Sequence, residues 1–164
     1  MDFSKFTDIE LIQMYGELLG EMRAKNIIRS KNVAGDLGEY LVIEHYCTTK
    51  GLPKLQIAAP STKNIDANGA NNGERYSIKT ITGTSTGAFY GIEKDADENM
   101  HPLFEHAVLV KLDDMYQPEL ILELDWDTFF RHKRWHSRIK AYILTLTKAL
   151  IEDGKVIYRK KADS

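Results

Sequence analysis

The sequence has few of the features that mark secreted, zinc-stabilised or membrane proteins. Cys47 is the only cysteine in 164 residues, so no internal disulfide can form, and no Cys and His spacing typical of a zinc site occurs. The first 22 residues carry acidic side chains among their apolar positions, which excludes a signal peptide or a spanning helix. We therefore expect a soluble cytoplasmic protein with no membrane partner.

Extremes of composition are also missing. Hydrophobic residues make up 43% of the chain and charged residues 28%, which excludes disordered, collagen-like and coiled-coil proteins. The length suits one globular domain, and neither a repeat nor a linker divides the sequence. We expect residues 1–164 to form a single domain.

The net charge of −2 is small, but the charges are unevenly distributed. Residues 1–130 hold 12 basic and 21 acidic side chains, whereas residues 131–161 hold 10 basic and 2 acidic ones. A basic C-terminal part suits contact with phosphates, although a solvated basic helix face would give the same pattern. The net charge therefore does not exclude a nucleic-acid partner.

Two helices are expected before any strand. Apolar spacing predicts a helix over residues 7–25, with Thr7 and Glu10 as a capping box, and a second helix over 35–51. Strands are expected at 52–59, 64–68, 74–81, 105–112, 118–125 and 155–161, and helical or mixed structure at 125–130 and 134–154. This order predicts an α/β fold with a central mixed sheet flanked by helices.

The most informative segment is a hairpin whose strands, 64–68 and 74–81, are joined by an Asn- and Gly-rich turn. Alternation along a strand places Ser77 and Lys79 on one face, and the hairpin brings Asp66 toward them. A carboxylate binds a hard divalent cation through oxygen, and a lysine positions the metal-bound water and the phosphate that gains negative charge. This combination predicts hydrolysis of phosphodiester bonds.

The order of Asp66, the Asn- and Gly-rich turn and the strand Ser77-Ile78-Lys79 resembles the PD-(D/E)xK nuclease superfamily, in particular the small type II restriction endonucleases. The resemblance covers residues 35–80. It implies a restriction-endonuclease-like fold with two N-terminal helices before the catalytic hairpin. It also implies Mg²⁺ as cofactor, with Mn²⁺ as a substitute, double-stranded DNA as substrate, and a homodimer.

The resemblance assigns roles to four residues. Asp66 matches the metal-binding aspartate and Lys79 the catalytic lysine, while Glu39 matches an acidic residue that many members place on the preceding helix, where it reaches the same metal. Ser77 stands where the family has a second acid, so the site has one negative charge fewer and a lower expected affinity for Mg²⁺. Glu39 is the expected second carboxylate, and Ser77 is expected to bind a water or to be a weak ligand.

Two further segments are candidates for nucleic-acid contact. Thr82 and Thr84 lie in a Thr- and Gly-rich loop that offers hydroxyl and backbone N–H groups to a phosphate, although a mobile surface loop has the same composition. The C-terminal basic run is expected to form a helix with basic and apolar side chains on opposite faces. Its candidate contacts are Arg131, Lys133, Arg134 and Arg138.

These features favour a Mg²⁺-dependent endodeoxyribonuclease, either a type II restriction enzyme or a related defence nuclease. Two alternatives stay open. A catalytically degenerate nuclease-fold protein would bind nucleic acid or a protein partner without cutting, as Ser77 suggests. An unrelated α+β protein would hold the hairpin by coincidence, and Asp66 and Lys79 side chains more than ~8 Å apart would favour it.

Overall fold

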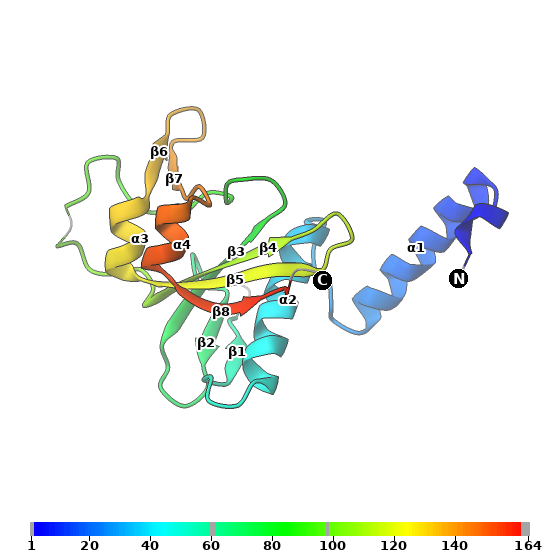
Figure 1. Cartoon of the computed structure of the whole chain (residues 1–164), viewed down its shortest axis with the longest axis horizontal. Coiled ribbons are helices and arrows are strands. Elements are labelled where there is room, and N and C mark those ends of the chain that lie inside the picture. The colour runs from blue at the N-terminus through cyan, green and yellow to red at the C-terminus, as the bar shows by residue number, and fades with distance from the viewer. Residues whose placement is uncertain (1, 60–61, 98, 162–164) are drawn as a thin grey trace.

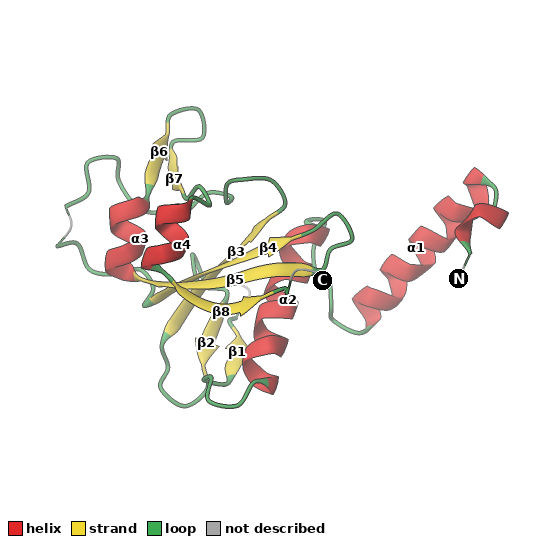
Figure 2. Cartoon of the chain, viewed as in Figure 1, coloured by secondary structure: helices red, strands yellow, loops and turns green. Residues whose placement is uncertain are grey.

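The computed structural model describes residues 2–59, 62–97 and 99–161. This part of the chain forms an α/β fold with four α-helices, a six-stranded mixed sheet and a separate two-stranded hairpin (Figure 1, Figure 2). The order in the sheet is β1-β2-β3-β4-β5-β8, in which only the pair β3 and β4 is parallel. Its strands are β1 (Leu55–Ile57), β2 (Ala67–Gly69), β3 (Arg75–Ile81), β4 (His106–Leu112), β5 (Pro118–Asp125) and β8 (Lys155–Arg159). The α/β class and the mixed sheet are as predicted.

Two α-helices precede the first strand, as predicted. A short 3-10 helix (Phe3–Lys5) comes before α1 (Asp8–Ala24), which begins with the predicted capping box. The Thr7 hydroxyl accepts a hydrogen bond from the backbone N–H of Glu10 at 3.3 Å, and the Glu10 carboxylate accepts one from the backbone N–H of Thr7 at 2.8 Å. Figure 1 shows that α1 extends away from the sheet.

The second helix, α2 (Val33–Thr48), packs against the sheet. It begins two residues earlier than predicted because Asn32 caps it, accepting a hydrogen bond from the Gly35 N–H at 3.2 Å. Close packing against β3 requires a glycine on this helix. A Cβ atom on Gly38 would lie 1.9 Å from Oγ1 of Thr80. The backbone of α2 therefore approaches β3 closely at Gly38.

The two faces of the sheet have separate apolar cores. One core joins Val42 and Tyr46 of α2 to Ile78 of β3. The other core joins Ile81, also on β3, to Phe129 and to residues of the long β3–β4 connection. The alternation of β3 side chains between the two cores follows from the period of two along a strand. Helices α3 (Trp126–His132) and α4 (Lys148–Asp153) cover the second core.

The C-terminal basic run folds differently from the prediction. Strands β6 (Arg134–His136) and β7 (Ala141–Ile143) form a hairpin that projects from the body of the protein (Figure 1). The turn between them ends at Lys140, whose φ of 49° is left-handed and incompatible with a continuous right-handed helix. We call residues 134–143 the basic hairpin. The predicted helical face is wrong, because Arg134 and Arg138 lie on this hairpin.

Among the described residues, no helix is both long enough and apolar enough to cross a bilayer.

Candidate functional site

The hairpin of β2 and β3 brings together the three residues that the sequence analysis placed there. Nζ of Lys79 lies 3.9 Å from Oδ2 of Asp66, and the hydroxyl of Ser77 lies 3.5 Å from the same oxygen. Ser77 and Lys79 therefore face the same side of β3, as alternation predicts. The separation is well below the ~8 Å beyond which a coincidental hairpin would be favoured.

Backbone hydrogen bonds hold the Asp66 carboxylate in place. The backbone N–H of Asp66 donates to the carbonyl of Tyr76 at 2.8 Å, which continues the pairing of the two strands. The backbone N–H of Ile78 then donates to Oδ2 of Asp66 at 2.7 Å. The hydrogen bonds and the ion pair that the described residues make with this carboxylate are all on Oδ2, and Oδ1 accepts no hydrogen bond from them. One carboxylate oxygen is thus anchored while the other is available to a ligand.

Glu39 of α2 completes the group, which we call the Asp66 site and define as Glu39, Asp66, Ser77 and Lys79. Burial raises the pKa of Glu39 to about 7, and the nearby charge of Asp66 adds to this increase. Two negative charges in a partly desolvated place favour protonation or a cation. The close approach of α2 to β3 at Gly38 brings the next residue, Glu39, beside the strand that carries Lys79.

Arg29 was not identified from the sequence, yet it is the ion-pair partner of Glu39. It lies on the segment between α1 and α2, and its guanidinium lowers the pKa of Glu39 against the stronger effect of burial. Buried Asp36 fixes this segment, since its Oδ2 accepts hydrogen bonds from the backbone N–H groups of Arg29 and Ser30 at 2.6 and 2.5 Å. No periodic pattern marks Arg29, because its position depends on a loop that turns back over α2.

A cavity of about 370 Å³ opens beside this group. Only Arg75 and Tyr76 of β3 pair with β2, and the cavity lies beside the later part of β3. Glu39 and Lys79 line it, and so does Thr82 of the Thr- and Gly-rich loop. An acidic and a basic side chain therefore face one hollow together with a predicted phosphate-contact residue.

The donor set of the Asp66 site suits a hard divalent cation that keeps most of its water. Among the described residues, no group of three or more His, Cys, Asp and Glu side chains is arranged to hold a metal. Mg²⁺ is commonly bound through one or two carboxylates with water or substrate phosphates as the other ligands, so Asp66 and Glu39 match that pattern. Ser77 is buried with 1% of its surface exposed, and its role as a water-binding or ligand position stays a prediction.

The predicted nucleic-acid contacts fall into two groups in the structure. Arg134 and Arg138 are exposed on the basic hairpin, next to exposed Lys140. Arg131 is exposed too, but its guanidinium lies 3.7 Å from Asp153 in an ion pair. The ammonium of half-buried Lys133 lies 3.2 Å from the centre of the Phe130 ring. The tip of the basic hairpin is thus the most available basic surface of this segment.

The Thr- and Gly-rich loop connects the cavity to the basic hairpin. The Phe89 N–H donates to the Tyr142 carbonyl at 2.8 Å, and the Leu144 N–H donates to the Thr86 hydroxyl at 3.0 Å. Thr82 is exposed and lines the cavity, while Thr84 is exposed two residues later. A ligand that fills the cavity and follows this loop would reach the basic hairpin.

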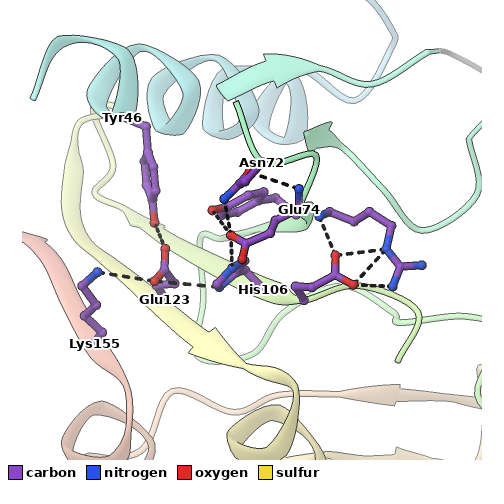
Figure 3. A network of polar contacts seen from close by, with 9 residues as sticks. Tyr46, Asn72, Glu74, His106, Glu123 and Lys155 are labelled. Atoms are coloured by element: carbon purple, nitrogen blue, oxygen red, sulfur yellow. Dashed lines mark hydrogen bonds and ion pairs between the residues drawn. The ribbon is translucent and has the colours of Figure 1, made fainter. Parts of the chain in front are cut away.

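A second polar cluster lies around the start of β3 and β4, and Figure 3 shows its side chains. We call it the Glu123 network: Tyr46, Glu74, His106, Glu123 and Lys155. The Tyr46 hydroxyl donates to Oε2 of Glu123 at 2.6 Å, while Oε1 of Glu123 lies 3.6 Å from the Lys155 ammonium. His106 lies between the two carboxylates, 3.0 Å from Glu74 and 3.9 Å from Glu123. Both oxygens of Glu123 have protein partners.

The electrostatics of the second cluster are those of a closed network. Burial raises the pKa of Tyr46, and the negative charge of Glu123 raises it further. Next to the network, hydrogen bonds from Arg75 lower the pKa of Glu105 to about 2. The ring of His106 stacks on that of Tyr76 at 4.5 Å between centres. This cluster joins three strands and α2, and it leaves neither oxygen of Glu123 without a protein partner.

No protein-family model matches the chain, and no curated protein matches it.

Proposed function

We propose that this protein hydrolyses phosphodiester bonds of double-stranded DNA with the help of a divalent cation, and that its sheet and helices are a restriction-endonuclease-like domain. The observation that carries the proposal is that Glu39 and Lys79 line one cavity, while the Asp66 carboxylate lies 3.9 Å from the Lys79 ammonium and its charge raises the pKa of Glu39. Two half-buried acids that share a place with a lysine favour a bound cation or a reaction there, because the negative charges repel each other.

The residues of the site divide the work. Asp66 and Glu39 would hold Mg²⁺, or Mn²⁺ in its place, and the cation would make a bound water more acidic and neutralise charge on the phosphate. Lys79 would orient the attacking water and the phosphate oxygen through its ammonium, which lies 3.9 Å from Oδ2 of Asp66. Ser77 supports the Asp66 carboxylate from the buried side of the hairpin.

The basic hairpin supports nucleic acid as the substrate class. A two-stranded ribbon fits the major groove of duplex DNA, and exposed arginines on it can contact phosphates or base edges. Arg134, Arg138 and Lys140 are exposed there, and the loop that lines the cavity is hydrogen-bonded to the same hairpin. Cutting and binding would therefore take place on one continuous surface.

Binding without cutting is the second candidate function. Two observations favour it: a buried serine occupies the place of the second acid, and Arg29 already pairs with Glu39. A protein of this kind would hold DNA with the basic hairpin and the cavity, and the Arg29 guanidinium would neutralise Glu39 instead of a cation.

A cleavage assay separates the two functions. Purified protein is incubated with plasmid DNA, linear duplex DNA and RNA, each with Mg²⁺, Mn²⁺ or EDTA. The proposal predicts cation-dependent cleavage of duplex DNA that falls at least ~100-fold in Lys79→Ala. Lys50→Ala is the matched control, because Lys50 is an exposed lysine after the far end of α2. Duplex binding with no cleavage of any substrate would instead establish the second function.

A further inference from the structure

Helix α1 has no buried residue, although it carries large apolar side chains along its length. Ile9, Ile12, Tyr15 and Leu18 are each more than half exposed, at 65, 66, 59 and 57%. An isolated helix of 17 residues is marginal in water, and two glycines in its interior weaken it further. Much of the apolar surface of α1 is therefore left exposed by the residues that the structure describes.

Four of the apolar residues of α1 form one stripe with coiled-coil spacing, whereas Ile9 and Ile12 lie outside this stripe. Leu11, Tyr15, Leu18 and Met22 follow one another at intervals of four, three and four residues, which places them on one side of the helix. The stripe borders an apolar groove whose opposite wall comes from α2 and from the β4–β5 turn. Residues of that wall include Leu37, Tyr40 and Tyr116. The groove and the stripe are one continuous surface.

The stripe is self-complementary when two copies of α1 run antiparallel. A two-fold axis that passes between Gly16 and Glu17 pairs each residue of one helix with a residue of the second copy, and the two residue numbers of a pair add up to 33. Leu11 then meets Met22 of the second copy, and Tyr15 meets Leu18. The same symmetry brings Asp8, at the start of the stripe, to Lys25 at its end. A parallel arrangement would place Asp8 against Asp8 and Lys25 against Lys25, which repels.

A membrane surface fits α1 poorly. Four acidic residues lie on the helix, against a single basic one, Arg23. Amphipathic helices that bind anionic lipids carry lysine and arginine on their polar faces. The acids on α1 are Asp8, Glu10, Glu17 and Glu21.

We infer that α1 is the interface of a two-fold dimer of this protein, in which the α1 helices of two copies pair antiparallel along their apolar stripes and close the groove beside α2. The inference does not depend on hydrolysis of DNA, because the oligomeric state can be measured whether or not the protein has nuclease activity.

Sedimentation equilibrium of the full chain tests this dimer. We expect a dimer for the wild type and at least ~100-fold weaker association for Leu18→Glu, because two charges would enter the centre of the stripe. Tyr90→Glu is the matched control, since Tyr90 is 60% exposed on a loop far along the chain, and we expect its association to be unchanged. Circular dichroism checks that each variant keeps its sheet.

A charge exchange tests the antiparallel direction. Asp8→Lys and Lys25→Asp should each weaken association about two- to fivefold, and the double variant Asp8→Lys/Lys25→Asp should return to the wild-type value. A wild type that stays monomeric at a protein concentration of about 100 μM would overturn the inference. A dimer that Leu18→Glu leaves intact, or a double variant no better than the singles, would also overturn it.

Discussion

The Asp66 site and the Glu123 network both contain carboxylates and a lysine, but the carboxylates of Asp66 and Glu123 differ in how many of their oxygens have protein partners. In the Glu123 network both carboxylate oxygens of Glu123 have protein partners (Figure 3). In the Asp66 site one oxygen of Asp66 is anchored by Ile78, and the other accepts no hydrogen bond from the described residues. A carboxylate with partners on both oxygens holds strands together, whereas a carboxylate oxygen without a protein partner can bind a ligand.

The largest expected effect comes from making one chemical change at both clusters. Asp66→Asn removes the charge but keeps an oxygen for the Ile78 N–H, so we expect cleavage to fall at least ~100-fold. The free energy of unfolding should change by less than ~1 kcal/mol. Cleavage rates and urea unfolding of the same preparation measure both quantities. Asp114→Asn, in an exposed turn, serves as the control.

Glu123→Gln should have the opposite profile. The substitution removes the carboxylate charge that pairs with Lys155 and that strengthens the hydrogen bond from the Tyr46 hydroxyl. We therefore expect the free energy of unfolding to fall by ~1.5–3 kcal/mol. Cleavage at a temperature where the variant is folded should be unchanged. Equal losses of cleavage activity in Glu123→Gln and Asp66→Asn would contradict the expectation that only the Asp66 site takes part in cleavage.

The contrast between these clusters was only partly visible in the sequence. Asp66, Ser77 and Lys79 were predicted to meet because a hairpin signature and a period of two along a strand are local properties. Their contacts at 3.5 and 3.9 Å confirm that placement. Only the family resemblance predicts a role for Glu39. Its position beside β3 depends on the missing side chain at Gly38, which lets α2 approach the strand, and this close packing is a property of the tertiary structure.

Other features depended on tertiary structure. Arg29 reaches Glu39 through a loop whose path is fixed by Asp36, and no sequence period reports such a path. The apolar residues Trp135, Ile139 and Tyr142 have a helical spacing, which predicts a helix where the structure has the basic hairpin. Hydrogen bonds to the Thr- and Gly-rich loop favour strands there instead.

The pH dependence of cation binding sharpens the comparison further. The pKa of Glu39 is raised to about 7, so this carboxylate is mainly neutral below that pH and charged above it. Mg²⁺ affinity should therefore increase as pH rises through about 7, and should fall below it by up to ~10-fold per pH unit. Cation titrations across this range measure the step. Glu39→Gln should bind weakly and lose the step, and a step that persists in this variant would assign it to another group.

The smallest expected effect concerns Arg29. Arg29→Met removes the guanidinium that pairs with Glu39, so cation binding no longer has to displace it, and we expect ~2–5-fold tighter binding of Mg²⁺. Lys31→Met, an exposed lysine on the same segment, should leave the affinity unchanged. Weaker binding in Arg29→Met would mean that this arginine organises the site rather than competing with the cation.

Manganese binding followed by electron paramagnetic resonance tests most directly whether Asp66 and Glu39 share a cation. The account predicts saturable Mn²⁺ binding at pH 8 that is lost in Asp66→Asn and in Glu39→Gln. Binding should be kept in Glu44→Gln, which changes an exposed acid on the same helix. Absence of Mn²⁺ binding by the wild type, or binding that survives both substitutions, would contradict it.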